Sequence, residues 1–160
     1  MATYYGAQLA SSPVNGANFD GGQVYGKNSE VFTANDLCTI DASHGLKVAG
    51  ATDAIYGMVQ KTQTMTSTNE TVALVKPVCL VPDLDYEFLM GCNANLTALT
   101  SVGAFYKLTG TTGAQQVDVT SGVQTTTARV VECTAVDPFG TGDLKTGKFR
   151  IVKRYNLMNY

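Results

Sequence analysis

Residues 128–155, ARVVECTAVDPFGTGDLKTGKFRIVKRY, decide the fold of this chain. Two runs rich in β-branched and apolar residues, 128–136 and 148–155, flank the segment 140–147. Short apolar runs bounded by turn residues are typical of strands, and glycine permits the backbone conformations that a tight connection needs. The stretch therefore predicts a β-hairpin whose loop uses three glycines, Gly140, Gly142 and Gly147.

The same loop matches the nucleotide-binding spacing G-x-x-x-x-G-K through Gly142, Gly147 and Lys148. A working P-loop follows a buried parallel strand, opens a helix and places Ser or Thr directly after the lysine. Here Phe149 follows the lysine, and both flanks are predicted strands. We therefore interpret the segment as a hairpin loop, and the sequence predicts no cofactor.

Outward from this hairpin, the chain from Val31 onward continues as short apolar runs bounded by Gly, Pro, Asn or Asp. Their close spacing leaves no room for helical crossovers, so the sheets should be antiparallel. The best helical candidate is 93–102, where Leu96, Leu99 and Val102 recur every three residues. The sequence predicts a mainly β fold, an antiparallel β-sandwich or barrel with an extended N-terminal arm and little helix.

The predicted arm, residues 1–30, is small, polar and glycine-rich, whereas residues 31–160 form a single predicted β-rich domain with a short C-terminal tail. A solvated linker has little reason to carry scattered aromatic side chains. These side chains could anchor the arm on another protein surface or pack back on the chain's own domain. The aromatic candidates for contact with a partner or another subunit are Tyr4, Tyr5, Phe19 and Tyr25.

The composition favours a β-sheet exterior, a surface that other subunits cover, or both. Charged residues make up 15% of the 160 residues, against roughly 25% in an average soluble domain. The net charge of -2 argues against nucleic-acid binding, which needs a basic surface. No run of 18 apolar residues is present, and the first residues lack the basic and apolar regions of a signal peptide. We expect neither a membrane span nor export by a cleaved signal.

Residues with catalytic potential are scarce. His44 is the only histidine and lies in a turn-like sequence, and no G-x-S-x-G elbow accompanies it. The four cysteines are far apart and form no C-x-x-C pair, so we expect buried free thiols in a reducing compartment. The sequence predicts that the protein is not an enzyme. The cysteines are Cys38, Cys79, Cys92 and Cys133.

Acidic residues alternate with apolar ones in the segment 82–88, PDLDYEF. On a strand, Asp83, Asp85 and Glu87 would share one face and could offer oxygen ligands to calcium. An amphipathic strand with its apolar face inward explains the same alternation. We favour the strand and predict no metal site.

Basic residues concentrate near the C-terminus in what we call the basic strip: Lys145, Lys148, Arg150, Lys153 and Arg154. On a strand, Phe149 and Ile151 would face inward and Arg150 outward. The strip predicts either a solvated or edge strand, or an electropositive surface that docks on an acidic neighbour. Beyond it, Tyr160 ends an apolar tail and is a further contact candidate.

The order of strands and turns resembles the head decoration, or cement, proteins of tailed bacteriophages. The likeness extends over roughly residues 31–155 and rests on strand order and turn placement. The segments that carry it are GLKVAGATDAIYGMV (45–59), TVALVKPV (71–78), VPDLDYEFLMG (81–91), VGAFYKLTG (102–110) and KFRIVKRY (148–155).

The resemblance implies a virion structural protein that decorates and stabilises the outside of an icosahedral capsid by bridging capsomers. It implies a homotrimer, the major capsid protein as partner, and synthesis in the host cytoplasm. Two other classes remain open on the residues alone. One is a carbohydrate- or receptor-binding β-module of a virion fibre or tail, and the other is a self-assembling capsid or tail-tube subunit.

Overall fold

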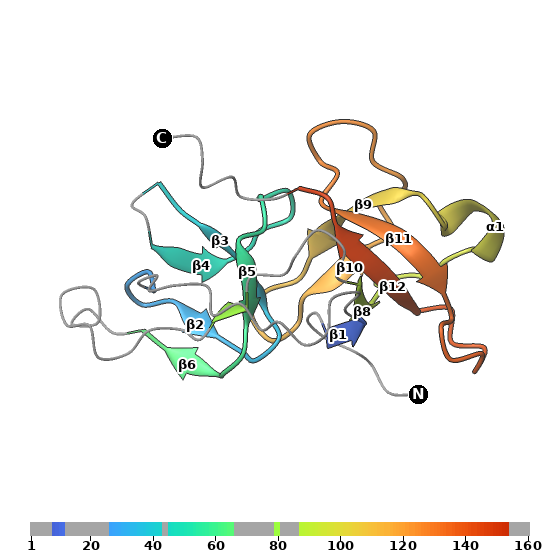
Figure 1. The fold of residues 1–160 in the computed structure, drawn as a ribbon. Helices are drawn as coiled ribbons and strands as arrows, with labels where there is room; N and C mark the ends of the chain where they lie inside the picture. Colours follow the sequence, from blue (N-terminus) through green and yellow to red (C-terminus); the bar gives the residue numbers. More distant parts are fainter. Residues whose placement is uncertain (1–7, 12–25, 43–44, 66–78, 81–86, 154–160) are drawn as a thin grey trace.

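The computed structural model describes residues 8–11, 26–42, 45–65, 79–80 and 87–153. Over these residues the chain is mainly β with antiparallel sheets and one short helix, which confirms the predicted fold class (Figure 1). The described part of the chain contains no helix long and apolar enough to cross a membrane.

The larger sheet has six strands in the order β1-β8-β12-β11-β9-β10. It curls into a half-barrel, because Val117 on β10 forms a bridge to Cys92, just after β8. The Asn93 amide also donates to the Val117 carbonyl at 3.1 Å. The strands are β1 (Gln8–Ser11), β8 (Glu87–Gly91), β9 (Phe105–Thr109), β10 (Gln116–Asp118), β11 (Val131–Val136) and β12 (Thr146–Ile151).

The predicted hairpin is confirmed, because β11 and β12 pair antiparallel with Cys133 opposite Phe149. Phe149 and Ile151 are buried and Arg150 is exposed, as the alternation predicted. However, β12 lies between β8 and β11, so the prediction of an edge strand was wrong. Strong alternation marks a sheet with one solvated face, and it does not separate central strands from edge strands.

Gly147 was predicted in the loop but lies inside β12. Its backbone needs no special conformation there; what matters is the missing side chain. A Cβ at this position would stand 2.8 Å from Leu96 Cδ1 and 2.8 Å from Phe149 Cε2. Gly147 therefore leaves the space into which Leu96 packs.

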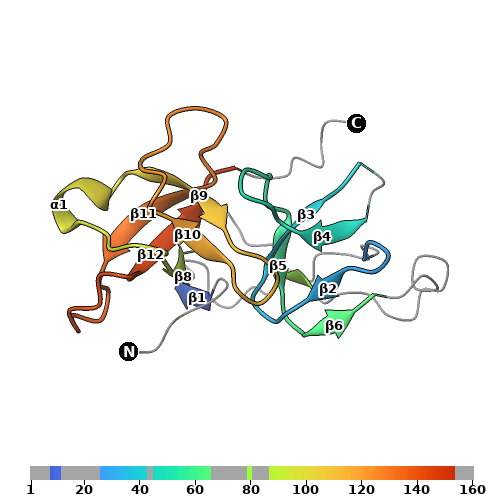
Figure 2. The same ribbon diagram turned by 180° about the vertical axis from the view of Figure 1, so that it is seen from behind.

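A second group of strands lies at the other end of the molecule (Figures 1 and 2). A four-stranded sheet has the order β4-β3-β5-β7, and β2 pairs with β6 beside it. The main hydrophobic core contains Leu37 and Met58 from this group together with Phe88 and Phe149 from the half-barrel. The strands are β2 (Val31–Phe32), β3 (Leu37–Ile40), β4 (Leu46–Val48), β5 (Gly57–Val59), β6 (Gln63–Thr64) and β7 (Cys79–Leu80).

Two buried polar side chains join the sheets across the β9–β10 loop. Gln115 Oε1 accepts from the Leu37 amide at 2.7 Å, and its Nε2 donates to the carbonyls of Leu37 at 3.0 Å and Ala49 at 2.9 Å. The Asp36 carboxylate accepts from Thr112 Oγ1 at 2.7 Å and the Gly113 amide at 2.9 Å. The loop is therefore fastened to the four-stranded sheet by hydrogen bonds to two buried side chains.

The predicted helix shortens to a single turn, α1 (Ala98–Ser101). Leu96 is buried, but Leu99 is 95% exposed and Val102 53% exposed, so the predicted apolar helix face was wrong. One turn is too short to present a continuous apolar stripe to the core. Leu96 alone reaches the interior, through the space above Gly147.

Parts of the predicted N-terminal arm lie in the sheets. β1 pairs with β8, Gly26 forms a bridge to Leu46, and Glu30 Oε1 accepts from the Val48 amide at 2.8 Å. The rest of the predicted arm, residues 1–7 and 12–25, lies outside the described residues. The aromatic contact candidates lie outside the described residues: Tyr4, Tyr5, Phe19 and Tyr25.

Candidate functional site

Two cations of the basic strip, Lys148 and Arg150, pair with acids on neighbouring strands. Arg150 Nη2 and Nε both lie 2.7 Å from Glu132 Oε2, across the β11–β12 pair. Lys148 Nζ lies 3.8 Å from Glu87 Oε2 on β8. These pairs reduce the electropositive character that the sequence suggested. Their partners could not be assigned from the sequence, because strand order was unknown.

The remaining members of the strip have separate positions. Lys153 Nζ donates to the carbonyls of Thr52 and Thr127, so this ammonium fastens two loops together. Lys145 is exposed and has no side-chain partner among the described residues. Arg154 and Tyr160 lie outside the described residues. The structure therefore does not bring the strip together as one free basic surface.

The loop that contains the P-loop match is closed by the carboxylate of Asp137, which precedes the match. Asp137 accepts from the amides of Thr141 at 2.9 Å and Gly142 at 2.8 Å. These bonds from Gly142 and Thr141 lower the pKa of Asp137. Amides that could have faced a phosphate are therefore already used, which supports the hairpin-loop interpretation.

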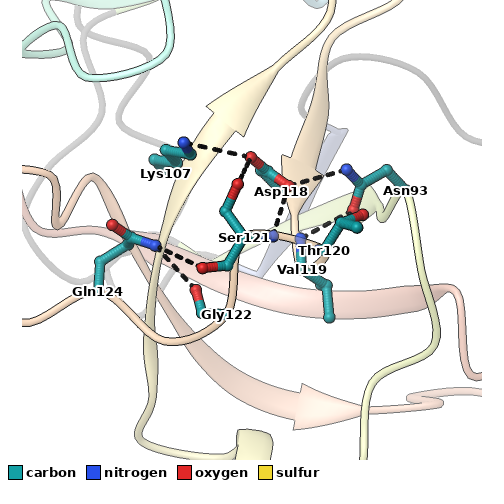
Figure 3. Close-up of polar contacts among 8 residues, drawn as sticks. All are labelled: Asn93, Lys107, Asp118, Val119, Thr120, Ser121, Gly122 and Gln124. Atoms are coloured by element: carbon teal, nitrogen blue, oxygen red, sulfur yellow. Dashed lines mark hydrogen bonds and ion pairs between the residues drawn. The ribbon is translucent and has the colours of Figure 1, made fainter.

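A polar cluster around Asp118 lies where the half-barrel closes (Figure 3). The Asp118 carboxylate accepts from Asn93 Nδ2 at 2.9 Å and from Ser121 Oγ at 2.6 Å. Lys107 Nζ lies 3.5 Å from the same carboxylate. This cluster was not predicted from the sequence. Asp118 and Ser121 have the spacing of a side-chain-capped turn, but Asn93 is distant in the sequence.

The hydrogen bonds of the Asp118 cluster stabilise the fold. Burial acts to raise the pKa of Asp118, but hydrogen bonds from Ser121 and Asn93 and the charge of Lys107 outweigh it and lower the pKa. Asn93 Oδ1 also accepts from the amides of Val119 and Thr120, at 2.8 and 3.1 Å. With its oxygens bonded and its pKa depressed, the carboxylate is a poor general base.

Replacing Asp118 with asparagine is expected to destabilise the protein at pH 6 by about 1–2 kcal/mol, because charge-assisted hydrogen bonds are lost. Since the folded-state pKa is lowered, this stabilisation is present above the unfolded pKa of about 4 and is lost as the pH falls through the folded value. Urea unfolding at pH 6 and pH 3 should therefore show the difference between wild type and Asp118→Asn shrinking. Thr120→Ala, which removes an exposed side chain, is the control. A difference that stays constant with pH would contradict the assignment.

Three of the four cysteines are free thiols in the core, as predicted: Cys38, Cys92 and Cys133. Burial raises the pKa of Cys133 to about 11 and raises that of Cys92 further. Such thiols are weak nucleophiles at neutral pH. Within the described residues, no group of three or more His, Cys, Asp or Glu side chains is placed to hold a metal ion.

Four exposed apolar side chains belong to α1, to the residue that follows it, and to the loop between β11 and β12. Both segments lie at the end of the half-barrel away from the four-stranded sheet (Figures 1 and 2). We call this group the α1-end surface. Its members are Leu99, 95% exposed, Phe139, 56%, Val102, 53%, and Leu144, 39%.

Backbone hydrogen bonds hold the α1-end surface in place. The Leu96 amide donates to the Leu144 carbonyl at 2.8 Å, which ties the approach to α1 to the hairpin loop. The Gly103 amide donates to the Cys133 carbonyl at 2.8 Å, and Ser101 Oγ accepts from the Thr97 amide at 2.9 Å. Leu99 therefore projects from a fixed turn.

The α1-end surface is the described feature that best fits an interaction site, because its apolar side chains are solvent-exposed and its backbone is held by hydrogen bonds. From the sequence, Leu99 and Val102 were noted only for their helical spacing, and Phe139 and Leu144 were left unassigned. Comparisons with protein-family models, curated proteins and solved structures found no match, so this assignment rests on geometry.

Proposed function

We propose that this chain is a virion structural protein that decorates and stabilises the outside of an icosahedral phage capsid. The observation that carries the proposal is the α1-end surface, where Leu99 is 95% exposed on a hydrogen-bonded turn. The resemblance to head decoration proteins in strand order and turn placement supports the same function.

An exposed leucine on a fixed turn is favourable when a partner covers it. Burying a leucine side chain contributes about 1.5–3 kcal/mol relative to leaving it in water. A protein partner can supply that burial, whereas a substrate would need convergent polar groups in a cleft. Asp118 and Gln115, each at the centre of several hydrogen bonds, already have protein partners. Asp118 accepts from Ser121 Oγ, and Gln115 accepts from the Leu37 amide. The surface thus favours protein binding over chemistry.

Stabilisation would arise from multivalent attachment. An oligomer that touches several capsid subunits makes its later contacts within one complex, so modest individual contacts give high total affinity. Binding the mature lattice more tightly than a ruptured one shifts the equilibrium toward the intact shell. The mechanism needs no cofactor and no covalent step.

The test uses heads of the tailed phage that encodes this chain, assembled without it. Purified protein added at micromolar concentration is expected to appear as extra density on the outer surface in cryo-electron microscopy. Treated heads should also resist heating better than untreated ones. Heads that show no added density would overturn the proposal, as would spontaneous growth of shells or tubes from the protein alone.

Removing residues 1–7 is the suitable test of the arm in the same binding assay. Deleting all of residues 1–30 would also remove β1 and the Glu30 carboxylate, and so would damage both sheets. If Tyr4 and Tyr5 contact the capsid, the shorter deletion should weaken attachment while the melting temperature stays unchanged. Unchanged attachment would argue that these two tyrosines make no capsid contact.

A further inference from the structure

We propose that acid opens the half-barrel where it closes, because protonation of Asp118 releases the contact between β10 and the residues that follow β8. We call this contact the seam. It joins Cys92 and Asn93 to Val117 and Asp118. The opening is local, so the other strands of the sheet keep their pairing. Whether or not the chain binds capsids, the seam would behave in this way.

Few backbone contacts hold the seam together. Among the described residues, a single bridge joins Cys92 to Val117, and the Asn93 amide donates to the Val117 carbonyl at 3.1 Å. By contrast, β8 pairs with β12 along its whole length, from Glu87 to Gly91. Local opening needs less free energy where few backbone hydrogen bonds must break. The seam is therefore a weak point of the half-barrel.

The side chain of Asn93 supplies much of the remaining attachment. Its Oδ1 accepts from the amides of Val119 at 2.8 Å and Thr120 at 3.1 Å. Its Nδ2 donates to Asp118 Oδ1 at 2.9 Å (Figure 3). An amide side chain has one accepting end and one donating end, so the carboxylate that accepts from Nδ2 also keeps Oδ1 facing the two backbone amides. Asp118 thus holds Asn93 in the orientation that closes the seam.

The surroundings of Asp118 suit the ionised carboxylate and not the neutral acid. Among the described residues, Lys107 on β9 is the charged group that faces this carboxylate, with its Nζ 3.5 Å away. The other groups that face it, on Asn93 and Ser121, are uncharged donors. Protonation would turn one acceptor oxygen into a donor that meets these donors. The remaining hydrogen bonds would lose their charge and become roughly half as strong.

The direction of the pH dependence follows from the charge of Asp118. Burial acts to raise its pKa, but the hydrogen bonds from Ser121 and Asn93 and the charge of Lys107 lower it overall. The seam is therefore stabilised above the unfolded pKa of about 4, and this stabilisation is lost as the pH falls through the lower folded value. Acid opens the seam, whereas base leaves it closed.

Opening would change what the half-barrel presents to solvent. Cys92 and Val117 are buried while the seam is closed. Once the seam opens, the amides of Val119 and Thr120 lose their acceptor on Asn93, and β10 becomes an uncovered edge strand. An uncovered edge can pair with another strand. The protonation of one carboxylate thus converts a closed half-barrel into an open sheet.

Amide hydrogen exchange followed by NMR on the full chain tests the proposal. Asp118→Asn at pH 6 serves as the neutral form of the side chain. In this variant the amides of Asn93, Val119 and Thr120 should lose at least about tenfold of their protection. They should also be at least about tenfold less protected than the Cys133 amide, which donates to the Ala104 carbonyl inside the sheet.

An acid series on the wild type repeats the test without a substitution. As the pH is lowered from 6 until the protein unfolds, the seam amides should be released before the Cys133 amide. Asp137→Asn is the matched control, because Asp137 is also a loop carboxylate whose pKa is lowered by backbone hydrogen bonds, and it makes none of the seam's hydrogen bonds. Its seam amides should keep their wild-type protection.

Two results would refute the local opening. One is release of the seam amides together with the Cys133 amide, in the variant and in the acid series alike, because the seam would then open only when the whole chain unfolds. The other is equal loss of seam protection in Asp137→Asn and Asp118→Asn, because the effect would then not depend on the contacts of Asp118.

Discussion

Gln115→Ala is expected to lower the free energy of unfolding by about 3–5 kcal/mol, a large share of the stability of a single domain. The wild-type side chain is fully buried and satisfies one amide and two carbonyls of the four-stranded sheet region. Truncation removes the bonds to the Leu37 amide and the Ala49 carbonyl and opens a cavity, while the Leu37 carbonyl keeps the hydrogen bond from the Ala49 amide. Chemical denaturation followed by circular dichroism measures the loss.

Two companion variants make the Gln115 prediction specific. Gln116→Ala changes the next residue, which is partly exposed, and should cost less than about 0.5 kcal/mol. Gln115→Glu keeps the volume but cannot donate to the carbonyls of Leu37 and Ala49, so it should be about as damaging as alanine at neutral pH. Equal stability of Gln115→Ala and Gln116→Ala would show that the buried hydrogen bonds do not hold the sheets together.

Gly110→Ala is expected to cost about 3–5 kcal/mol, through backbone strain and a clash in the β9–β10 loop. Gly110 has a φ of 87°, where L-residues are unfavourable. In addition, a Cβ there would overlap the Ala114 carbonyl oxygen, which belongs to the backbone and cannot rotate away. Since Thr112, Gly113 and Gln115 follow in this loop, its displacement would also break the contacts to the four-stranded sheet.

The variant Gly122→Ala separates the backbone strain of Gly110→Ala from its steric clash. Gly122 has a φ of 72° but no atom within 4 Å of the added Cβ, so only the strain remains and the expected cost is about 1–2 kcal/mol. Thermal unfolding of both variants measures the difference, which reports the clash alone. Similar melting temperatures for the two variants would mean that the Ala114 carbonyl can move out of the way.

The strands were predictable because their signals are local. In residues 128–155 the alternation of Cys133, Phe149 and Ile151 with polar neighbours marked the buried face before any partner was known. The placement of β12 was not predictable, because neighbours in a sheet are chosen by long-range packing. β1 escaped notice since QLAS is short and has no clear alternation, and it becomes a strand through pairing with β8.

The candidate site was less predictable than the fold. A spacing of three suggested a helix over residues 93–102, but of Leu96, Leu99 and Val102 only Leu96 is buried. Whether the basic strip forms one charged surface stayed open, because its partners Glu87 and Glu132 are distant from it in the sequence. Exposure and ion pairing depend on which strands become neighbours, and a single sequence does not state this.

The strand order also determines when each sheet can form during translation. The four-stranded sheet uses no residue beyond Leu80, so it can form once the first half of the chain has left the ribosome. The pair of β8 with β12 must wait until Ile151 has been made, and β1, the first described strand to be synthesised, must wait at least until β8 is complete at Gly91. The earliest strand is therefore unpaired while the four-stranded sheet is being made, and in that period a newly made chain is most open to pairing with another.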